Sequence, residues 1–214
     1  MNKRKDSEDM DINQKGILLV VSGPSGCGKG TVLSHVLKDK DNYSLSVSYT
    51  TRNPRPGEID GVHYGFVSKD DFLKQIEAGN MLEYTEYCGN YYGTPQSTVN
   101  SLLEKGVNVV LEIETVGAMN VKKLRSDAVL VMILPPSYEV LENRLRSRGT
   151  NSEDDIAKRL LRAKEELTTL PEYHYCIINQ DGCSEHAAEM IKRIVEVEKH
   201  KIERNNMILH HFYQ

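Results

Sequence analysis

The segment SGPSGCGKGT, from Ser22 to Thr31, decides the expected fold of this 214-residue chain. It follows the apolar run Ile17 to Val21 and precedes a stretch, 32–37, whose apolar residues recur at helical spacing. The segment contains the spacing GxxxxGK, in which backbone N–H groups surround phosphates while the lysine, here Lys29, reaches the β and γ oxygens. Because this motif lies between a buried-type strand and a helix, the sequence predicts a nucleotide phosphate loop.

Short apolar strands alternate with helix-length periodic segments along the rest of the chain. This rhythm is typical of a parallel α/β sheet. We expect strands at 17–22, 43–48, 107–114, 128–134 and 175–179. Helix starts are indicated at Ser68, at Thr94-Pro95 and at Ser152, and helix ends at Gly79 and Gly106.

Two regions interrupt the alternation of strands and helices. In the first, 50–94, two alternating stretches flank Gly89-Asn90 and predict a small antiparallel insertion. The second, 144–155, is a charged, glycine-containing segment between two helices, which suits a mobile lid. The expected division of the chain is a disordered tail at 1–15, a core at 16–49, 95–143 and 156–206, the insertion, the lid, and a C-terminal tail at 207–214.

The composition is that of a soluble globular protein. A net charge of −4 gives no general attraction to nucleic acid or to an anionic membrane, so an anionic ligand must be held by a local cluster of Lys and Arg. No apolar run approaches the roughly 20 residues that span a bilayer. The four cysteines lack the CxxC spacing of a zinc site. We therefore expect a cytoplasmic protein without nucleic-acid or membrane partners, either a monomer or a homo-oligomer.

A cluster of arginines and tyrosines occupies SYTTRNPRPGEIDGVHY, from Ser48 to Tyr64. Arg52 and Arg55 lie three residues apart, and Arg55 stands between two prolines. Such a turn is fairly rigid and carries two guanidinium forks, each of which suits a bidentate grip on a phosphate. Either arginine taken alone is more commonly a solvated surface residue, but together they suit a phosphate.

This stretch resembles the GMP-binding segment of guanylate kinases, and the phosphate loop, GNYYGT, RLRSRGT and IAKRL match the same family in the same order. The resemblance extends over 16–206. It implies a P-loop nucleoside-monophosphate kinase fold, with a five-stranded parallel sheet flanked by helices, a small mixed or antiparallel GMP-binding insertion and a helical lid. It also implies transfer of the γ-phosphoryl group of ATP to GMP, and to dGMP, with ATP and Mg²⁺ as cofactors.

The resemblance also assigns site residues. The ATP phosphates are expected at Gly23, Pro24, Ser25, Gly26, Cys27, Gly28, Lys29, Gly30 and Thr31. GMP is expected at Ser48, Arg52, Arg55, Tyr64, Glu83, Tyr92, Thr94 and Glu114. The catalytic set is expected to be Lys29, Arg144, Arg148 and Arg159, with Arg146 a bystander.

The metal ligands are less fully defined by the sequence. Gly30 stands where a Ser or Thr usually contacts Mg²⁺, and Thr31 follows it. Either Thr31 takes part or water fills that place in the metal shell. Glu112 lies at the carboxyl end of an expected strand, where open α/β sheets bind ligands, and we expect it to hold a Mg²⁺-bound water.

Glu83 suits guanine on chemical grounds that do not depend on the family. Guanine presents N1–H and N2–H₂ donors side by side, which one carboxylate accepts together, whereas adenine has a lone pair at N1 that repels a carboxylate. Two other positions depart from the family pattern: Glu114 stands where Asp is more common, and Val116 stands where Gln is usual.

Two other functions compete with this interpretation. A binding module would keep the fold and the GMP pocket without turning over ATP, but the presence of Lys29 and of the lid arginines opposes it. A kinase for another nucleoside monophosphate is the closer competitor, and Glu83 opposes that one.

Overall fold

The computed structural model describes residues 15–87, 89–147, 152–205 and 213. A sheet of five parallel strands forms the centre of the molecule, in the order β2-β7-β1-β8-β9. The strands are β1 (Leu18–Ser22), β2 (Tyr43–Leu45), β7 (Asn108–Glu112), β8 (Val129–Leu134) and β9 (Tyr175–Ile178). Each strand expected from the apolar runs is present, so the predicted parallel α/β sheet is confirmed.

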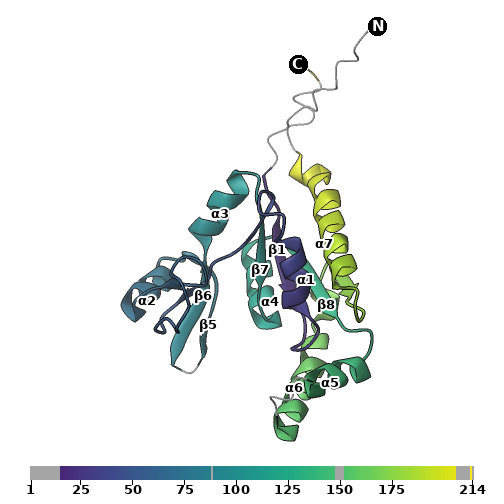
Figure 1. Ribbon diagram of the computed structural model, residues 1–214. Helices are drawn as coiled ribbons and strands as arrows, with labels where there is room; N and C mark the ends of the chain where they lie inside the picture. Colours follow the sequence, from purple (N-terminus) through teal and green to yellow (C-terminus); the bar gives the residue numbers. More distant parts are fainter. Residues whose placement is uncertain (1–14, 88, 148–151, 206–212, 214) are drawn as a thin grey trace.

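Helices cover both faces of this sheet (Figure 1). Strand β1 is buried along its whole length, as a central parallel strand should be, and alternate residues contribute to different clusters. Leu19 and Val21 belong to the cluster formed with α1 (Lys29–Val36) and α7 (Ser184–Lys199). Leu18 and Val20 belong to the cluster formed with α3 (Gln96–Glu104) and α4 (Thr115–Leu124). The core therefore has two apolar layers, one on each side of β1.

The predicted insertion forms a second, mixed sheet in the order β4-β3-β6-β5, at the left in Figure 1. It contains β3 (Tyr49–Thr50), β4 (Gly65–Phe66), β5 (Met81–Tyr87), β6 (Asn90–Pro95) and the helix α2 (Lys69–Glu77). Strands β5 and β6 are antiparallel, whereas β3 and β4 are parallel. The ring of the buried Phe72 on α2 stacks on Tyr91 of β6, with 5.5 Å between the ring centroids, and so attaches the helix to the sheet.

The helix boundaries follow the expected signals at most positions. Ser68 caps α2 by accepting a hydrogen bond from the Asp71 backbone N–H, and Ser152 caps α6 (Glu153–Leu167) in the same way. Gly79 and Gly106 have positive φ directly after α2 and α3, as predicted for helix ends. The exception is the start of α3, where Thr94 does not cap the helix: Pro95 is the N-cap, without a side-chain hydrogen bond.

The helices α5 (Tyr138–Ser147) and α6 share a small core of their own, below the main sheet in Figure 1. Its members are Leu141, Leu145, Ile156, Leu160 and Ala163. The first residues of the expected lid, 144–147, form the last turn of α5, and its end lies in the first turn of α6. Residues 148–151 lie outside the described residues.

Two short 3₁₀ turns complete the described chain: η1 (Leu170–Glu172) leads into β9, and η2 (Ile202–Arg204) follows α7. The expected tails, 1–15 and 207–214, lie outside the described residues except for Lys15 and Tyr213. Within the described ranges, none of the helices has the length and apolar composition needed to cross a membrane.

Candidate functional site

The loop between β1 and α1 has a tightly constrained conformation. Gly28 precedes α1 with φ of 90°, a left-handed conformation in which a side chain is strained. A Cβ atom built on Gly28 would lie 2.4 Å from Nδ2 of Asn179, so a larger residue has no space there. The Lys29 ammonium donates a hydrogen bond to the Gly23 carbonyl, which holds the lysine across the loop. This is the geometry that the glycines at 23 and 28 predict for a phosphate loop.

Two residues from distant segments brace this loop from behind. The Cys27 carbonyl accepts hydrogen bonds from Asn179 Nδ2 at 2.8 Å and from Arg144 Nη1 at 3.1 Å. Arg144 also donates to the Asn179 carbonyl and pairs with Asp181 at 2.6 Å. Cys27 itself is buried, and burial raises the pKa of its thiol. Arg144 therefore donates four hydrogen bonds to three acceptors, one of which, the Cys27 carbonyl, belongs to the loop.

The other lid arginines differ sharply in their surroundings. Arg159 of α6 donates a hydrogen bond from Nη1 to the Ser25 hydroxyl at 3.2 Å, which brings it to the phosphate loop. Arg146, the expected bystander, pairs with Glu142 and Glu153 on the exposed side of α5 and α6. The expected catalytic residue Arg148 lies outside the described residues.

Glu83 and Thr94 face each other across the β5–β6 pair. The Thr94 hydroxyl donates a hydrogen bond to Oε1 of Glu83 at 2.7 Å. Burial raises the pKa of the Glu83 carboxyl, although the hydrogen bonds from Thr94 partly oppose this effect. Gly117 of α4 lies close to the other oxygen, because a Cβ built on it would be 3.5 Å from Oε2. The pocket at Glu83 is thus formed between the insertion and α4.

The arginine cluster is held by Glu58, which the sequence interpretation did not include. Both Nη atoms of Arg52 donate to the Glu58 carboxylate at 2.7 Å, and this contact raises the pKa of Arg52. The Arg52 guanidinium lies over the ring of Tyr64, 5.1 Å from its centroid. Arg55 is exposed in the same turn.

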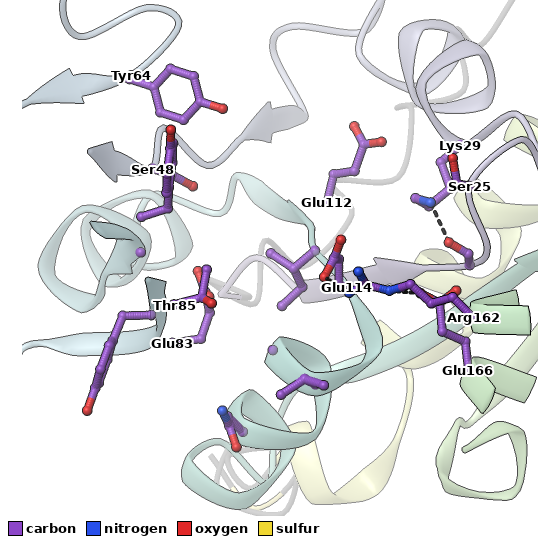
Figure 2. A pocket seen from close by; sticks show the side chains of 18 of the residues that line it. Ser25, Lys29, Ser48, Tyr64, Glu83, Thr85, Glu112, Glu114, Arg162 and Glu166 are labelled. Atoms are coloured by element: carbon purple, nitrogen blue, oxygen red, sulfur yellow. Dashed lines mark hydrogen bonds and ion pairs between the residues drawn. The ribbon is translucent and has the colours of Figure 1, made fainter. Parts of the chain in front are cut away.

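A cavity of about 890 Å³ extends from the phosphate loop to the Glu83 carboxyl (Figure 2). Ten of the predicted residues line it: Gly23, Ser25, Lys29, Ser48, Tyr64, Glu83, Tyr92, Glu112, Glu114 and Arg159. Figure 2 shows Ser25 and Lys29 on one side, Ser48, Tyr64 and Glu83 on the other, and Glu112 and Glu114 between them. The cavity therefore connects the phosphate loop with the insertion.

Other predicted residues do not line this cavity. Thr94 borders an adjacent cavity of about 170 Å³, which also contacts Ser48, Tyr64 and Glu112. Thr31 is exposed in the first turn of α1. The predicted residues that do not line the large cavity are Pro24, Gly26, Cys27, Gly28, Gly30, Thr31, Arg52, Arg55, Thr94 and Arg144.

The family model for guanylate kinase matches residues 15–198. The chain belongs to the guanylate kinase family. It is 48% identical over 194 residues to the guanylate kinases of Streptococcus pyogenes serotypes M3 and M28, and each match covers 90% of this chain and 91% of the relative. The crystal structure of guanylate kinase from Anaplasma phagocytophilum superposes with a TM-score of 0.65 at 32% identity, covering 89% of this chain and 90% of that one.

The cavity is also lined by two charged residues that the sequence interpretation missed, Arg162 and Glu166. Arg162 pairs with Glu114 at 2.6 Å and lies 3.4 Å from the Glu166 carboxylate. Burial raises the pKa of Glu166, one of whose oxygens has no hydrogen-bond partner within the described part of the chain. The signal for Arg162 was its spacing: it lies three residues after Arg159, on the same side of α6.

The two departures from the guanylate kinase pattern both lie at this cavity. Glu114 is the N-cap position of α4, and its ion pair with Arg162 links α4 to α6. Val116 is exposed and also lines the cavity. Both substitutions are therefore located where α4 meets the space between the phosphate loop and the insertion.

Proposed function

We propose that this chain transfers the γ-phosphoryl group of ATP to GMP, giving ADP and GDP. The observation that carries the proposal is the cavity of about 890 Å³ that has Lys29 and Arg159 on one side and Ser48, Glu83 and Tyr92 on the other. Its size suits two nucleotide-sized ligands meeting at their phosphates. Membership of the guanylate kinase family supports the same reaction.

In this proposal, ATP binds at the phosphate loop. The loop backbone and the N-terminus of α1 offer N–H donors to the phosphates, and the helix dipole favours negative charge there. Lys29 leaves the Gly23 carbonyl and reaches the β and γ oxygens. Asn179 and Arg144 keep the loop in shape through the Cys27 carbonyl.

GMP binds on the side of the insertion. Glu83, with one oxygen fixed by Thr94, accepts the N1–H and N2–H₂ donors of guanine, while Ser48 and Glu114 border the same space. The GMP phosphate is held by Arg52, Arg55, Tyr64 and Tyr92. Adenine lacks the donor pair, so AMP leaves the Glu83 carboxylate without its partners.

The attacking group is an oxygen of the GMP phosphate, which is already anionic at neutral pH, so the reaction requires no catalytic base. The main obstacle is repulsion between two anionic nucleotides. Lys29 and the arginines 144, 148 and 159 neutralise this charge while donor and acceptor are held in line. Movement of the insertion and of the lid toward each other excludes water and limits hydrolysis of ATP.

Mg²⁺, which Glu112 and Thr31 would help to hold, would neutralise part of the negative charge of the nucleotide phosphates. The donors in this chain fit such an ion, because Mg²⁺ prefers oxygen ligands and retains several waters. Glu112 places an exposed carboxylate in the cavity with Lys29, and Thr31 offers a hydroxyl one turn into α1. A Cβ on Gly30 would contact no atom within 4 Å, so the space beside Thr31 is open to water. Among the described residues no group of three His, Cys, Asp or Glu side chains is placed to hold a metal ion.

One assay tests the proposal. ADP production from ATP and Mg²⁺ is followed with AMP, GMP, CMP or UMP as acceptor, using wild-type protein and Lys29→Ala. We expect turnover with GMP far above that with the other monophosphates, and near-total loss in Lys29→Ala. Equal rates with all four acceptors would refute the guanine assignment. Failure to convert GMP would refute the function.

A further inference from the structure

The turn that carries the arginine cluster is built around Glu58. Pro56 and Gly57 occupy its two central positions, Gly57 has φ of 86°, and the Glu58 N–H donates to the Arg55 carbonyl at 3.0 Å. Proline followed by a positive-φ glycine is the pattern of a type II turn. The carboxylate of Glu58 folds back over this turn and accepts a hydrogen bond from the Arg55 N–H at 2.8 Å.

The same carboxylate orients Arg52. Its two oxygens accept from Nη1 and Nη2 at 2.7 Å each, which is a bidentate contact across the end of the guanidinium. The Arg52 side chain is 12% exposed and the Glu58 side chain 18% exposed. The rings of Tyr64 and Phe66 lie 5.1 and 5.7 Å from the guanidinium carbon. Arg52 is therefore held by a carboxylate at its end and by aromatic rings on its faces.

The donors of Arg52 can be accounted for individually. A guanidinium has five N–H groups, and Nη1 uses both of its own, one for Glu58 and one for the Asn53 carbonyl at 2.9 Å. Nη2 uses one for Glu58. The two that Glu58 and Asn53 do not use, on Nε and Nη2, form the other edge of the guanidinium, which matches two oxygens of a phosphate. The Tyr92 hydroxyl, itself assigned to the GMP phosphate, also lies within hydrogen-bonding reach of Arg52, and this contact helps to raise the pKa of Arg52.

We propose that Glu58 is a positioning residue for GMP, which fixes Arg52 so that its Nε–Nη2 edge is presented to the GMP phosphate. This inference rests on the proposed function, in which Arg52 binds that phosphate. Contact with Arg52 and with the Arg55 N–H lowers the pKa of Glu58 to about 2, so the carboxylate stays ionised throughout the working pH range.

The direction in which GMP binding changes when Glu58 is removed distinguishes a positioning role from a purely electrostatic one. Glu58 is an anion close to the site of an anionic substrate, so on charge alone its removal should strengthen GMP binding. A carboxylate that acts by orienting Arg52 has the opposite consequence, because its loss frees the guanidinium to adopt other rotamers and weakens the phosphate grip.

The test compares Glu58→Gln with wild type, with Arg52→Ala, and with the double variant. We expect Glu58→Gln to raise KM for GMP about tenfold or more and to change KM for ATP by less than about twofold. In the Arg52→Ala background the same substitution should add no further effect, because Glu58 acts through Arg52. Glu142→Gln, which removes one of the two carboxylate partners of Arg146, is the matched control and should leave both KM values unchanged.

A second variant tests the same role of Glu58 in case Glu58→Gln fails to fold. Gly57→Ala strains the positive-φ turn and displaces Glu58 without removing any charge, and its Cβ meets no atom within 4 Å. We expect it to raise KM for GMP in the same direction, with the Tm and the KM for ATP measured alongside.

The possible results distinguish the two proposals. A lower KM for GMP in Glu58→Gln, or an unchanged one while Arg52→Ala impairs GMP binding, would overturn the role of Glu58 and leave the proposed function intact. An Arg52→Ala protein with wild-type KM for GMP would refute the phosphate assignment itself, and the role of Glu58 with it.

Discussion

The hydroxyl of Thr94 donates a 2.7 Å hydrogen bond to Oε1 of Glu83 across neighbouring strands of the insertion. This hydrogen bond restricts the rotation of the carboxylate, and Oε2 lies close to Gly117, where an added Cβ would be 3.5 Å away. A preset carboxylate loses little rotamer freedom when it accepts two parallel donors. The cross-strand pair is thus an arrangement that favours guanine over adenine.

Glu83→Gln should therefore change the choice of acceptor without changing the use of ATP. A glutamine keeps one acceptor oxygen but replaces the other with an NH₂ group, which opposes a donor of guanine. We expect kcat/KM for GMP to fall by about 10² or more, with KM for ATP unchanged. The measurement is a competition between GMP and AMP. Glu86→Gln, an exposed position on the same strand, is the control. Unchanged preference in Glu83→Gln would contradict the assignment.

The raised pKa of Glu83 gives a pH dependence of defined sign. Its ionised form accepts the guanine donors, and burial moves its pKa above the model-peptide value of 4.5. As the pH falls toward this raised pKa, the carboxyl binds a proton and GMP affinity is lost. The phosphate of GMP also titrates, near pH 6. GMP dissociation constants measured from pH 8 to pH 5 should therefore weaken more steeply for wild type than for Glu83→Gln, which retains only the titration of the phosphate. Identical profiles would show that Glu83 does not contact the base.

The sequence was informative where local pattern and burial coincide. Strands β1, β7 and β8 each contain an uninterrupted run of at least three apolar residues because both faces of the central sheet are covered, so their positions could be predicted directly. The approach of Glu83 to Thr94 follows from a hairpin around Gly89-Asn90, which is also a local signal.

The contacts that the sequence did not predict depend on how distant segments are brought together. Arg144 reaches the Cys27 carbonyl across 117 positions, and Arg162 reaches Glu114 across 48. Neither pairing leaves a periodic pattern in the chain. Glu58 is different, because it lies only six positions from Arg52 and follows a Pro-Gly turn. A prediction of a type II turn at 55–58 would have indicated that the chain folds back there and that Glu58 could pair with Arg52.

Arg144 and Arg146 offer a matched comparison, since they lie two residues apart on α5. Arg144 contacts the Cys27 and Asn179 carbonyls and Asp181, and its side chain is 20% exposed. Arg146 makes ion pairs only at the surface, 42% exposed. We expect Arg144→Ala to lower the free energy of unfolding by roughly 1–3 kcal/mol and to weaken ATP binding, because the loop loses its brace. Arg146→Ala should cost less than about 0.5 kcal/mol. Urea unfolding and ATP titration measure both effects, and equal losses in the two variants would contradict the brace.

Replacement of glycine by alanine has opposite expected effects at two positions of the phosphate loop, Gly28 and Gly30. At Gly28, φ is 90° and a Cβ would lie 2.4 Å from Asn179 Nδ2, the atom that donates to the Cys27 carbonyl. Gly28→Ala must therefore strain the backbone and push Asn179 away, and we expect a loss of roughly 1–3 kcal/mol in unfolding free energy together with weaker ATP binding.

At Gly30 the same change has a different expected outcome. The residue lies inside α1, and its Cβ would contact no atom within 4 Å. Replacing a helical glycine by alanine removes conformational freedom from the unfolded chain, so Gly30→Ala should raise the free energy of unfolding by about 0.5–1 kcal/mol. Denaturant unfolding of both variants measures these two changes in the free energy of unfolding. Equal stability of Gly28→Ala and Gly30→Ala would contradict this account. It would mean that the left-handed conformation of Gly28 and its contact with Asn179 do not hold the loop.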